Sequence, residues 1–182
     1  CLDCVATEWA GQDEPMIVDN RAQVLDPMTA YQITSMLEGV VQRGTATLVR
    51  AVGRPIAGKT GTTNDQKDAW FSGYNPDLVA TAWVGFDQPA TLGRREYGGT
   101  AALPIWMQFM GAALEGVPDR TIPMPSGLVT ARIDPTTGRS APPGSSDAFL
   151  EIFKQEEAPP PYSELEMGGY DSGGAVTPLE LF

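Results

Sequence analysis

The fold of this chain is decided by one stretch, Gly58-Lys59-Thr60-Gly61-Thr62-Thr63, which fits two unrelated chemistries. Counted from Gly53, it completes the pattern G-x-x-x-x-G-K-[ST] of a phosphate-binding loop. Counted from Lys59, it forms K-T-G, in which a cation is followed by hydroxyl groups and by a glycine that allows close approach to the backbone. The first interpretation requires a helix after Lys59, and the second requires an extended strand.

The residues around Lys59 argue against the helix. Residues 60–65 are poor helix formers and provide no apolar stripe, and Pro55 lacks an N–H that a phosphate loop would use. Nucleotide binding therefore remains only as an alternative.

A strand fits the same residues better. Alternation along a strand places Lys59 and Gly61 on one side and Thr60 and Thr62 on the other. An ammonium group beside two hydroxyl groups suits recognition of a carboxylate. We therefore take Lys59, Thr60, Gly61 and Thr62 as the candidate binding residues.

The composition narrows the class of protein. The 182 residues are enough for one domain with a core, and the formal charge of -11 opposes binding to nucleic acid or to an anionic membrane surface. Because the chain contains no histidine, it holds neither a His-dependent catalytic triad nor a His-ligated metal site. No apolar run is long enough to span a membrane. The absence of an initiator Met at Cys1 leads us to expect a piece of a longer protein.

Cys1 and Cys4 form a C-x-x-C pair, which is compatible with a redox pair, half of a zinc site or a small disulfide. Zinc would need two further ligands, and loop-forming residues surround the pair, so a disulfide or an idle thiol pair is favoured.

Helices are predicted at two places. Asp26 as N-cap, Pro27 at the first helical position and Gly44 as a stop predict a helix from Pro27 to Arg43, with apolar residues spaced by three and four. A second helix, apolar nearly all round, is predicted over Pro104–Glu115, and such a helix must be buried against a sheet.

Strands are predicted between and after these helices. The β-branched segment Thr45–Val52 is expected to be extended, and a strand carries Lys59. Asp68–Tyr74 and Leu78–Phe86 follow as a hairpin, with turn chemistry between them. Connections this short produce an antiparallel sheet. One more short strand is predicted at Leu128–Ile133.

The domain organisation is predicted from composition and from these elements. Residues 1–25 are a linker or the end of an insertion, 26–118 the main domain, and 119–146 an extension with a short strand. Residues 147–182 contain eight acidic residues against the single base Lys154, and are predicted to be a disordered acidic tail that serves solubility or docks to another protein.

Longer stretches of the sequence support the K-T-G interpretation over the phosphate loop. Gly58–Asp65, Lys67–Tyr74 and Trp83–Asp87 closely resemble the C-terminal part of the transpeptidase domain of class A penicillin-binding proteins, most like the 1A type. The similarity covers most of residues 16–140, and the Cys1/Cys4 pair resembles one in an insertion of 1A-type members.

The resemblance implies an α/β fold of the α+β type, an antiparallel sheet flanked by helices as in penicillin-binding transpeptidases and serine β-lactamases. It implies that Lys59 helps to bind the substrate carboxylate and tunes the catalytic groups, and that Thr60 and Thr62 hydrogen-bond that carboxylate. The backbone N–H of Thr62 would form half of the oxyanion hole.

The chain departs from the family because it contains neither S-x-x-K nor S-x-N. The nucleophile, its lysine base and the second motif are therefore expected upstream, with a glycosyltransferase domain and a membrane anchor. The fold is expected to be incomplete here, with uncovered apolar faces, and this chain alone is expected to be inactive.

The resemblance also implies the partners and surroundings of the parent protein. Stem peptides of peptidoglycan and β-lactams are the expected ligands, cell-wall assembly proteins are candidate partners, and the expected location is the periplasmic side of a bacterial inner membrane. Transpeptidation needs no cofactor, and a divalent metal would serve only the upstream glycosyltransferase domain. A non-catalytic interaction module remains the other alternative.

Overall fold

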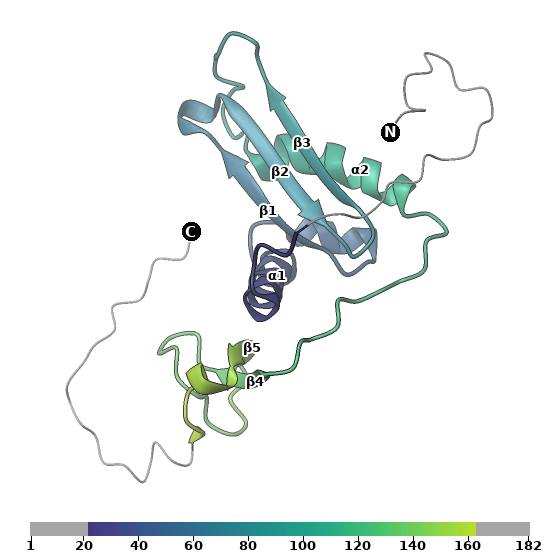
Figure 1. Cartoon of the computed structure of the whole chain (residues 1–182). Coiled ribbons are helices and arrows are strands. Elements are labelled where there is room, and N and C mark those ends of the chain that lie inside the picture. The colour runs from purple at the N-terminus through teal and green to yellow at the C-terminus, as the bar shows by residue number, and fades with distance from the viewer. Residues whose placement is uncertain (1–21, 163–182) are drawn as a thin grey trace, which may run out of the picture.

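A computed structural model of the chain describes residues 22–162, which form two groups of elements (Figure 1). The first group is a three-stranded sheet with two helices. The second is a separate two-stranded sheet near the C-terminal end of the described part. The bounds are α1 (Pro27–Arg43), β1 (Ala57–Thr62), β2 (Asp68–Tyr74), β3 (Val79–Gly85), α2 (Leu103–Ala113), β4 (Leu128–Ile133) and β5 (Phe149–Lys154). Short 3-10 helices span Thr47–Val52, Asn64–Gln66 and Gln155–Glu157, and a π turn at Gly98–Ala102 precedes α2.

The first helix, α1, has the predicted bounds because its capping groups are local. Asp26 Oδ2 accepts hydrogen bonds from the backbone N–H of Thr29 at 2.9 Å and from its hydroxyl at 3.0 Å. The hydrogen bond from the N–H of Thr29 is the main reason that the pKa of the Asp26 carboxyl is lowered. At the other end, the N–H of Gly44 donates to the carbonyl of Val40 at 3.1 Å.

The expectation that Thr45–Val52 is extended is wrong, because Thr47–Val52 is a 3-10 helix. The N–H of Val49 donates to the carbonyl of Ala46 at 3.0 Å and closes the first turn of this helix. Gly53 ends the helix with a left-handed φ of 71°. Ala46 and Val49 are completely buried, so packing in the core overrides the β propensity of this segment.

The predicted antiparallel sheet is confirmed, with strand order β1-β2-β3. The predicted turn joins β2 to β3 through Asn75, whose side-chain oxygen accepts the N–H groups of Asp77 and Leu78. The structure contradicts the phosphate-loop alternative, because Lys59 and Thr60 lie within β1 and not at the start of a helix.

One face of the three-stranded sheet packs against α2. Phe71 of β2 meets Trp106 of α2 edge to face, with ring centroids 4.8 Å apart, and the Trp106 indole donates to the carbonyl of Ala80 at 2.9 Å. The core around this contact consists of Val41, Ala46, Val49, Ile56, Ala69, Phe71, Ala102, Leu103, Trp106, Met110 and Leu114. This core holds the sheet, α2 and the segment after α1 together.

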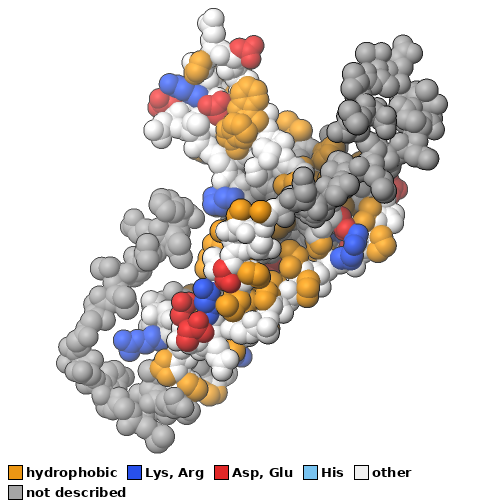
Figure 2. All heavy atoms as spheres, viewed as in Figure 1, with side chains coloured by type: hydrophobic (Ala, Val, Ile, Leu, Met, Phe, Trp, Pro, Cys, Tyr) orange, Lys and Arg blue, Asp and Glu red, His pale blue; other side chains and the backbone are white. Residues whose placement is uncertain are grey.

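Other apolar side chains remain exposed, as expected for an incomplete fold. Trp70 and Trp83 are 42% and 45% exposed on the sheet face opposite Phe71, and Figure 2 shows hydrophobic side chains gathered over the upper part of the sheet. α2 is buried only through Leu103, Trp106 and Met110, whereas Ile105 and Phe109 are about half exposed. The prediction that this helix is buried against the sheet is therefore confirmed for one of its faces, and the other face is uncovered, as expected for an incomplete fold.

The predicted strand β4 is confirmed, but the prediction of a disordered tail from residue 147 is wrong for β5. β5 pairs with β4 and contacts α1, where the Gln32 side chain donates to the carbonyl of Ile152 at 3.1 Å. Arg43 lies over the Phe149 ring at 4.6 Å. Residues 163–182 of the predicted tail lie outside the described residues, as do Cys1 and Cys4.

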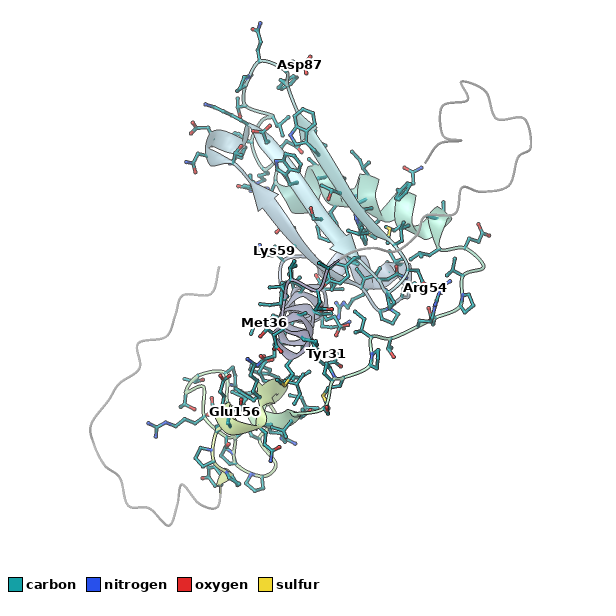
Figure 3. The ribbon with its side chains drawn as sticks, viewed as in Figure 1. Tyr31, Met36, Arg54, Lys59, Asp87 and Glu156 are labelled. Carbon is teal, nitrogen blue, oxygen red and sulfur yellow. The ribbon has the colours of Figure 1, made fainter. Side chains whose placement is uncertain are left out.

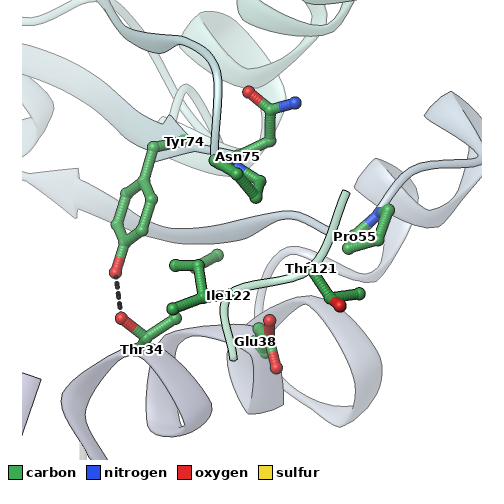
Figure 4. A pocket seen from close by; sticks show the side chains of 9 residues that line it. Thr34, Glu38, Pro55, Tyr74, Asn75, Thr121 and Ile122 are labelled. Carbon is green, nitrogen blue, oxygen red and sulfur yellow. Dashed lines mark hydrogen bonds between the residues drawn. The ribbon is translucent and has the colours of Figure 1, made fainter. Parts of the chain in front are cut away.

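The segment between α2 and β4 is held to the main sheet by Arg54. Its guanidinium donates to the carbonyl of Leu114 at 2.8 Å and to that of Val117 at 2.5 Å, and pairs with Asp119 at 2.6 Å. The chain then passes over α1. There, residues of this segment, of α1 and of the sheet with its loops enclose a cavity of about 10 Å³, which is too small for a substrate (Figure 4). The labelled lining residues are Thr34, Glu38, Pro55, Tyr74, Asn75, Thr121 and Ile122.

Candidate active-site strand

β1 carries all four candidate residues and forms one edge of the sheet, so one side of its backbone has no partner strand among residues 22–162. The N–H of Thr63 donates to the carbonyl of Asp68 at 3.0 Å and therefore points towards β2. Because successive N–H groups of a strand point to opposite edges, the N–H of Thr62 points to the open edge. This is the direction that an oxyanion-hole donor requires.

Lys59 lies on the outer face of the sheet. It pairs in register with Ser72, whose hydroxyl is hydrogen-bonded to that of Thr81 at 2.9 Å. The Lys59 ammonium donates to the carbonyl of Thr60 at 3.0 Å, and the structure gives it no carboxylate partner within the described segment. Figure 3 shows Lys59 on β1 at the side of the sheet near α1. The ammonium charge is thus available to an anion.

Thr60 and Thr62 lie on the other face of β1, in register with Phe71 and Ala69. The Thr60 hydroxyl is hydrogen-bonded to the hydroxyl of Thr45 at 3.1 Å. The structure therefore has the predicted alternation of Lys59 and Gly61 against the two threonines. It also adds Thr45 to the site, a residue that sequence reasoning placed only in a segment expected to be extended.

A second residue added by the structure is Gly98, at the start of the π turn. Its N–H donates to the Thr62 hydroxyl at 3.1 Å. A Cβ at Gly98 would overlap the carbonyl oxygen of Trp70 and lie 2.6 Å from that of Gly61, so only glycine fits against the two strands. Sequence reasoning missed this residue, and the adjacent glycines Gly98 and Gly99 are the signal that could have indicated such a close approach.

Gly61 has a structural role in the pairing of β1 with β2. A Cβ at this position would lie 3.2 Å from the Cβ of Trp70, which is tighter than ordinary contact. Gly61 therefore lets Trp70 lie directly across the strand pair.

The end of β1 is fixed by the turn to β2. The Thr63 hydroxyl accepts the N–H of Asp68 at 2.8 Å, and the Asp68 carboxylate accepts the indole N–H of Trp83 at 3.0 Å. Asp65 and Gln66 between them have left-handed φ angles of 59° and 54°, so the short 3-10 turn at Asn64–Gln66 ends sharply and no α-helix follows β1. This turn holds Thr62 at the edge of the sheet.

The described residues contain no group of three or more side chains suited to a metal ion. No helix among them is long and apolar enough to cross a membrane. Burial raises the pKa of the Glu38 carboxyl on α1.

Comparison with known proteins identifies the family of the chain. Residues 13–111 match the family described as the penicillin binding protein transpeptidase domain, so the chain belongs to that family. The predicted family and fold class are confirmed.

Several relatives carry the name penicillin-binding protein 1A. The protein of that name from Pseudomonas aeruginosa is 54% identical over 167 residues, which cover 88% of this chain and 20% of the relative. The one from Neisseria gonorrhoeae is 47% identical and covers 66% of this chain and 15% of the relative. The crystal structure of penicillin-binding protein 1A from Haemophilus influenzae superposes with a TM-score of 0.67 at 35% identity, over 73% of this chain and 21% of that one. The chain thus spans about a fifth of the length of these relatives.

Proposed function

We propose that this chain is the C-terminal portion of a peptidoglycan D,D-transpeptidase and supplies one wall of its acyl-serine active site. The observation that carries the proposal is the K-T-G strand at an open sheet edge. There the N–H of Thr62 faces outward, and the Lys59 ammonium has no carboxylate partner within residues 22–162. The strand thus offers a hydrogen-bond donor and a positive charge to an anionic substrate.

The reaction begins when a serine outside this chain attacks the carbonyl carbon of the penultimate D-Ala of a stem peptide. As the bond forms, negative charge moves to the carbonyl oxygen, which the N–H of Thr62 and the N–H of the serine stabilise. One such donor contributes about 3 kcal/mol to transition-state stabilisation. The terminal D-Ala then leaves with a proton, and the acyl group passes to an amine of a neighbouring strand.

Lys59, Thr60 and Thr62 bind the terminal carboxylate of the donor peptide, and Gly61 allows the peptide to approach the strand. A β-lactam carries a carboxylate and a reactive carbonyl in a comparable arrangement, so it acylates the same serine. Stem peptides and β-lactams are therefore the proposed ligands.

The complete protein is proposed to be a bifunctional synthase, anchored in the bacterial inner membrane and facing the periplasm. Its upstream domain would polymerise glycan strands, with a divalent metal serving that domain only, and transpeptidation would need no cofactor. Cell-wall assembly proteins are its proposed partners. The similarity to proteins named penicillin-binding protein 1A supports this assignment.

The role of Lys59 is tested in the complete synthase by acylation with a fluorescent penicillin. Lys59→Ala should slow acylation at least about 100-fold, because the carboxylate loses its charged hydrogen-bond donor. Lys67→Ala is the matched control, since Lys67 forms only a loose, exposed ion pair with Asp65 at 3.8 Å and should acylate at the wild-type rate. Equal rates for Lys59→Ala and the wild type would contradict the proposed role.

A second experiment tests the division of the active site. The 182-residue chain by itself should not be labelled by the fluorescent penicillin, because it contains no S-x-x-K nucleophile. Covalent labelling of this chain would overturn that division. A complete protein that is never acylated would instead support the non-catalytic interaction module.

A further inference from the structure

The Thr60 hydroxyl of the K-T-G strand is held by a residue outside the motif. Thr45 lies between α1 and the 3-10 helix, and its Oγ1 is 3.1 Å from that of Thr60. Fifteen residues of sequence separate the two side chains, so only the folded chain brings them together.

The backbone around Thr45 is fixed on both sides. The N–H groups of Gly44 and Ala46 both donate to the carbonyl of Val40, at 3.1 and 3.2 Å, and Ala46 is completely buried. Gly99 of the π turn packs nearby, since a Cβ there would lie 3.5 Å from the carbonyl oxygen of Thr45. Thr45 therefore presents its hydroxyl from a defined position.

The chemistry of the two hydroxyls fixes the direction of the hydrogen bond when a carboxylate is bound. A hydroxyl has one hydrogen to donate and two lone pairs to accept, whereas an ionised carboxylate only accepts. If Thr60 donates its hydrogen to the carboxylate, its oxygen must accept the hydrogen of Thr45. The bonds then run in one direction, from Thr45 to Thr60 to the carboxylate, and each strengthens the next.

Thr62 follows the same rule with a different partner. The N–H of Gly98 can only donate, so it fills an acceptor site of the Thr62 hydroxyl and leaves its hydrogen free for another acceptor. Each of the two motif hydroxyls thus accepts a hydrogen bond from a residue outside the motif, which leaves its own hydrogen for the carboxylate. Thr60 accepts this hydrogen bond from a side chain, which a substitution can remove.

We propose that Thr45 is a positioning residue that orients the Thr60 hydroxyl as a donor to the substrate carboxylate. This inference rests on the proposed function. It adds a residue from outside the K-T-G strand that sets the preference for a free carboxylate.

The test compares two thioester peptides in the complete synthase, one ending in a free carboxylate and the other in a carboxamide. Thr45→Val preserves the shape of the side chain and removes its hydroxyl, and it should lower the acylation rate constant for the carboxylate about fivefold. The rate for the carboxamide should change less than about twofold, because that group can itself donate to Thr60.

Two further variants separate positioning from a structural effect. Thr45→Ser restores the hydroxyl and should recover carboxylate acylation to within about twofold of the wild type. Thr47→Val makes the same replacement two residues away and should leave both rates unchanged.

An equal loss with both peptides, or a wild-type rate in Thr45→Val, would overturn the inference and leave the proposed function intact. Failure of the wild-type synthase to react with the fluorescent penicillin would overturn both.

Discussion

Replacement of Gly98 by alanine tests whether the π turn positions β1, the strand that we propose carries the active-site residues. The φ of Gly98 is not among the left-handed values in the structure, so alanine meets no backbone penalty there and the effect is purely steric. Its Cβ would lie 2.6 Å from the carbonyl oxygen of Gly61, whereas ordinary contacts begin at 3.4 Å. The turn and β1 must therefore separate by about 1 Å.

This separation should affect both stability and catalysis. Overpacking of this kind costs about 1–3 kcal/mol, which corresponds to a fall of roughly 2–10 °C in the unfolding midpoint of a domain of this size. It also breaks the hydrogen bond from Gly98 to Thr62 and moves the N–H of Thr62, so acylation should slow by roughly 10- to 100-fold.

The assay measures thermal unfolding and penicillin acylation of the complete synthase, with Gly99→Ala as the matched control. A Cβ at Gly99 makes only ordinary contacts, 3.5 Å from Thr45 and 3.9 Å from Thr60, so that variant should acylate within about twofold of the wild type. If Gly98→Ala and Gly99→Ala behaved alike, the close approach of the turn to β1 would be refuted.

Three other substitutions test the fold. Gly111→Ala, within α2 and with open space around its Cβ, should raise the thermal midpoint, because alanine stabilises a helix by about 0.5–1 kcal/mol relative to glycine. Arg54→Met should lower the midpoint by leaving the carbonyls of Leu114 and Val117 unpaired, at a cost of about 1–3 kcal/mol, and should speed proteolysis of the segment after α2. Burial raises the pKa of Glu38, so the fold loses stability as the pH rises from the unfolded pKa of 4.5 to the higher folded pKa, and the full cost of the charged form is present above the folded pKa. Glu38→Gln should therefore raise the midpoint at pH 7, and the gain should vanish below the unfolded pKa of 4.5.

Local signals located most of the elements. α1 has its predicted bounds because Asp26, Pro27 and Gly44 each act on the helix turn next to them. The β2–β3 hairpin follows from a turn that Asn75 closes through its own side chain. The alternation of Lys59 and Gly61 against the threonines is a property of any strand.

The wrong predictions share one physical cause. The segment Thr47–Val52 has β-branched residues but forms a 3-10 helix because Val49 is buried. The segment Phe149–Lys154 lies in an acidic part of the sequence but forms a strand that pairs with β4. Contact with α1, through Arg43 and Gln32, stabilises β5. Composition measures only the average cost of ordering a segment, whereas the partner supplied by the fold determines whether it is ordered.

The sequence by itself determined that Gly58–Thr63 carries K-T-G on an extended strand, because residue type and strand period are local properties. Only the tertiary structure decided that β1 lies at an open edge with the N–H of Thr62 facing outward. It also decided that Thr45 and Gly98, which lie 15 and 36 residues from their partners, complete the hydrogen bonds of the two motif threonines. Such contacts depend on how distant elements pack, and no local pattern encodes them.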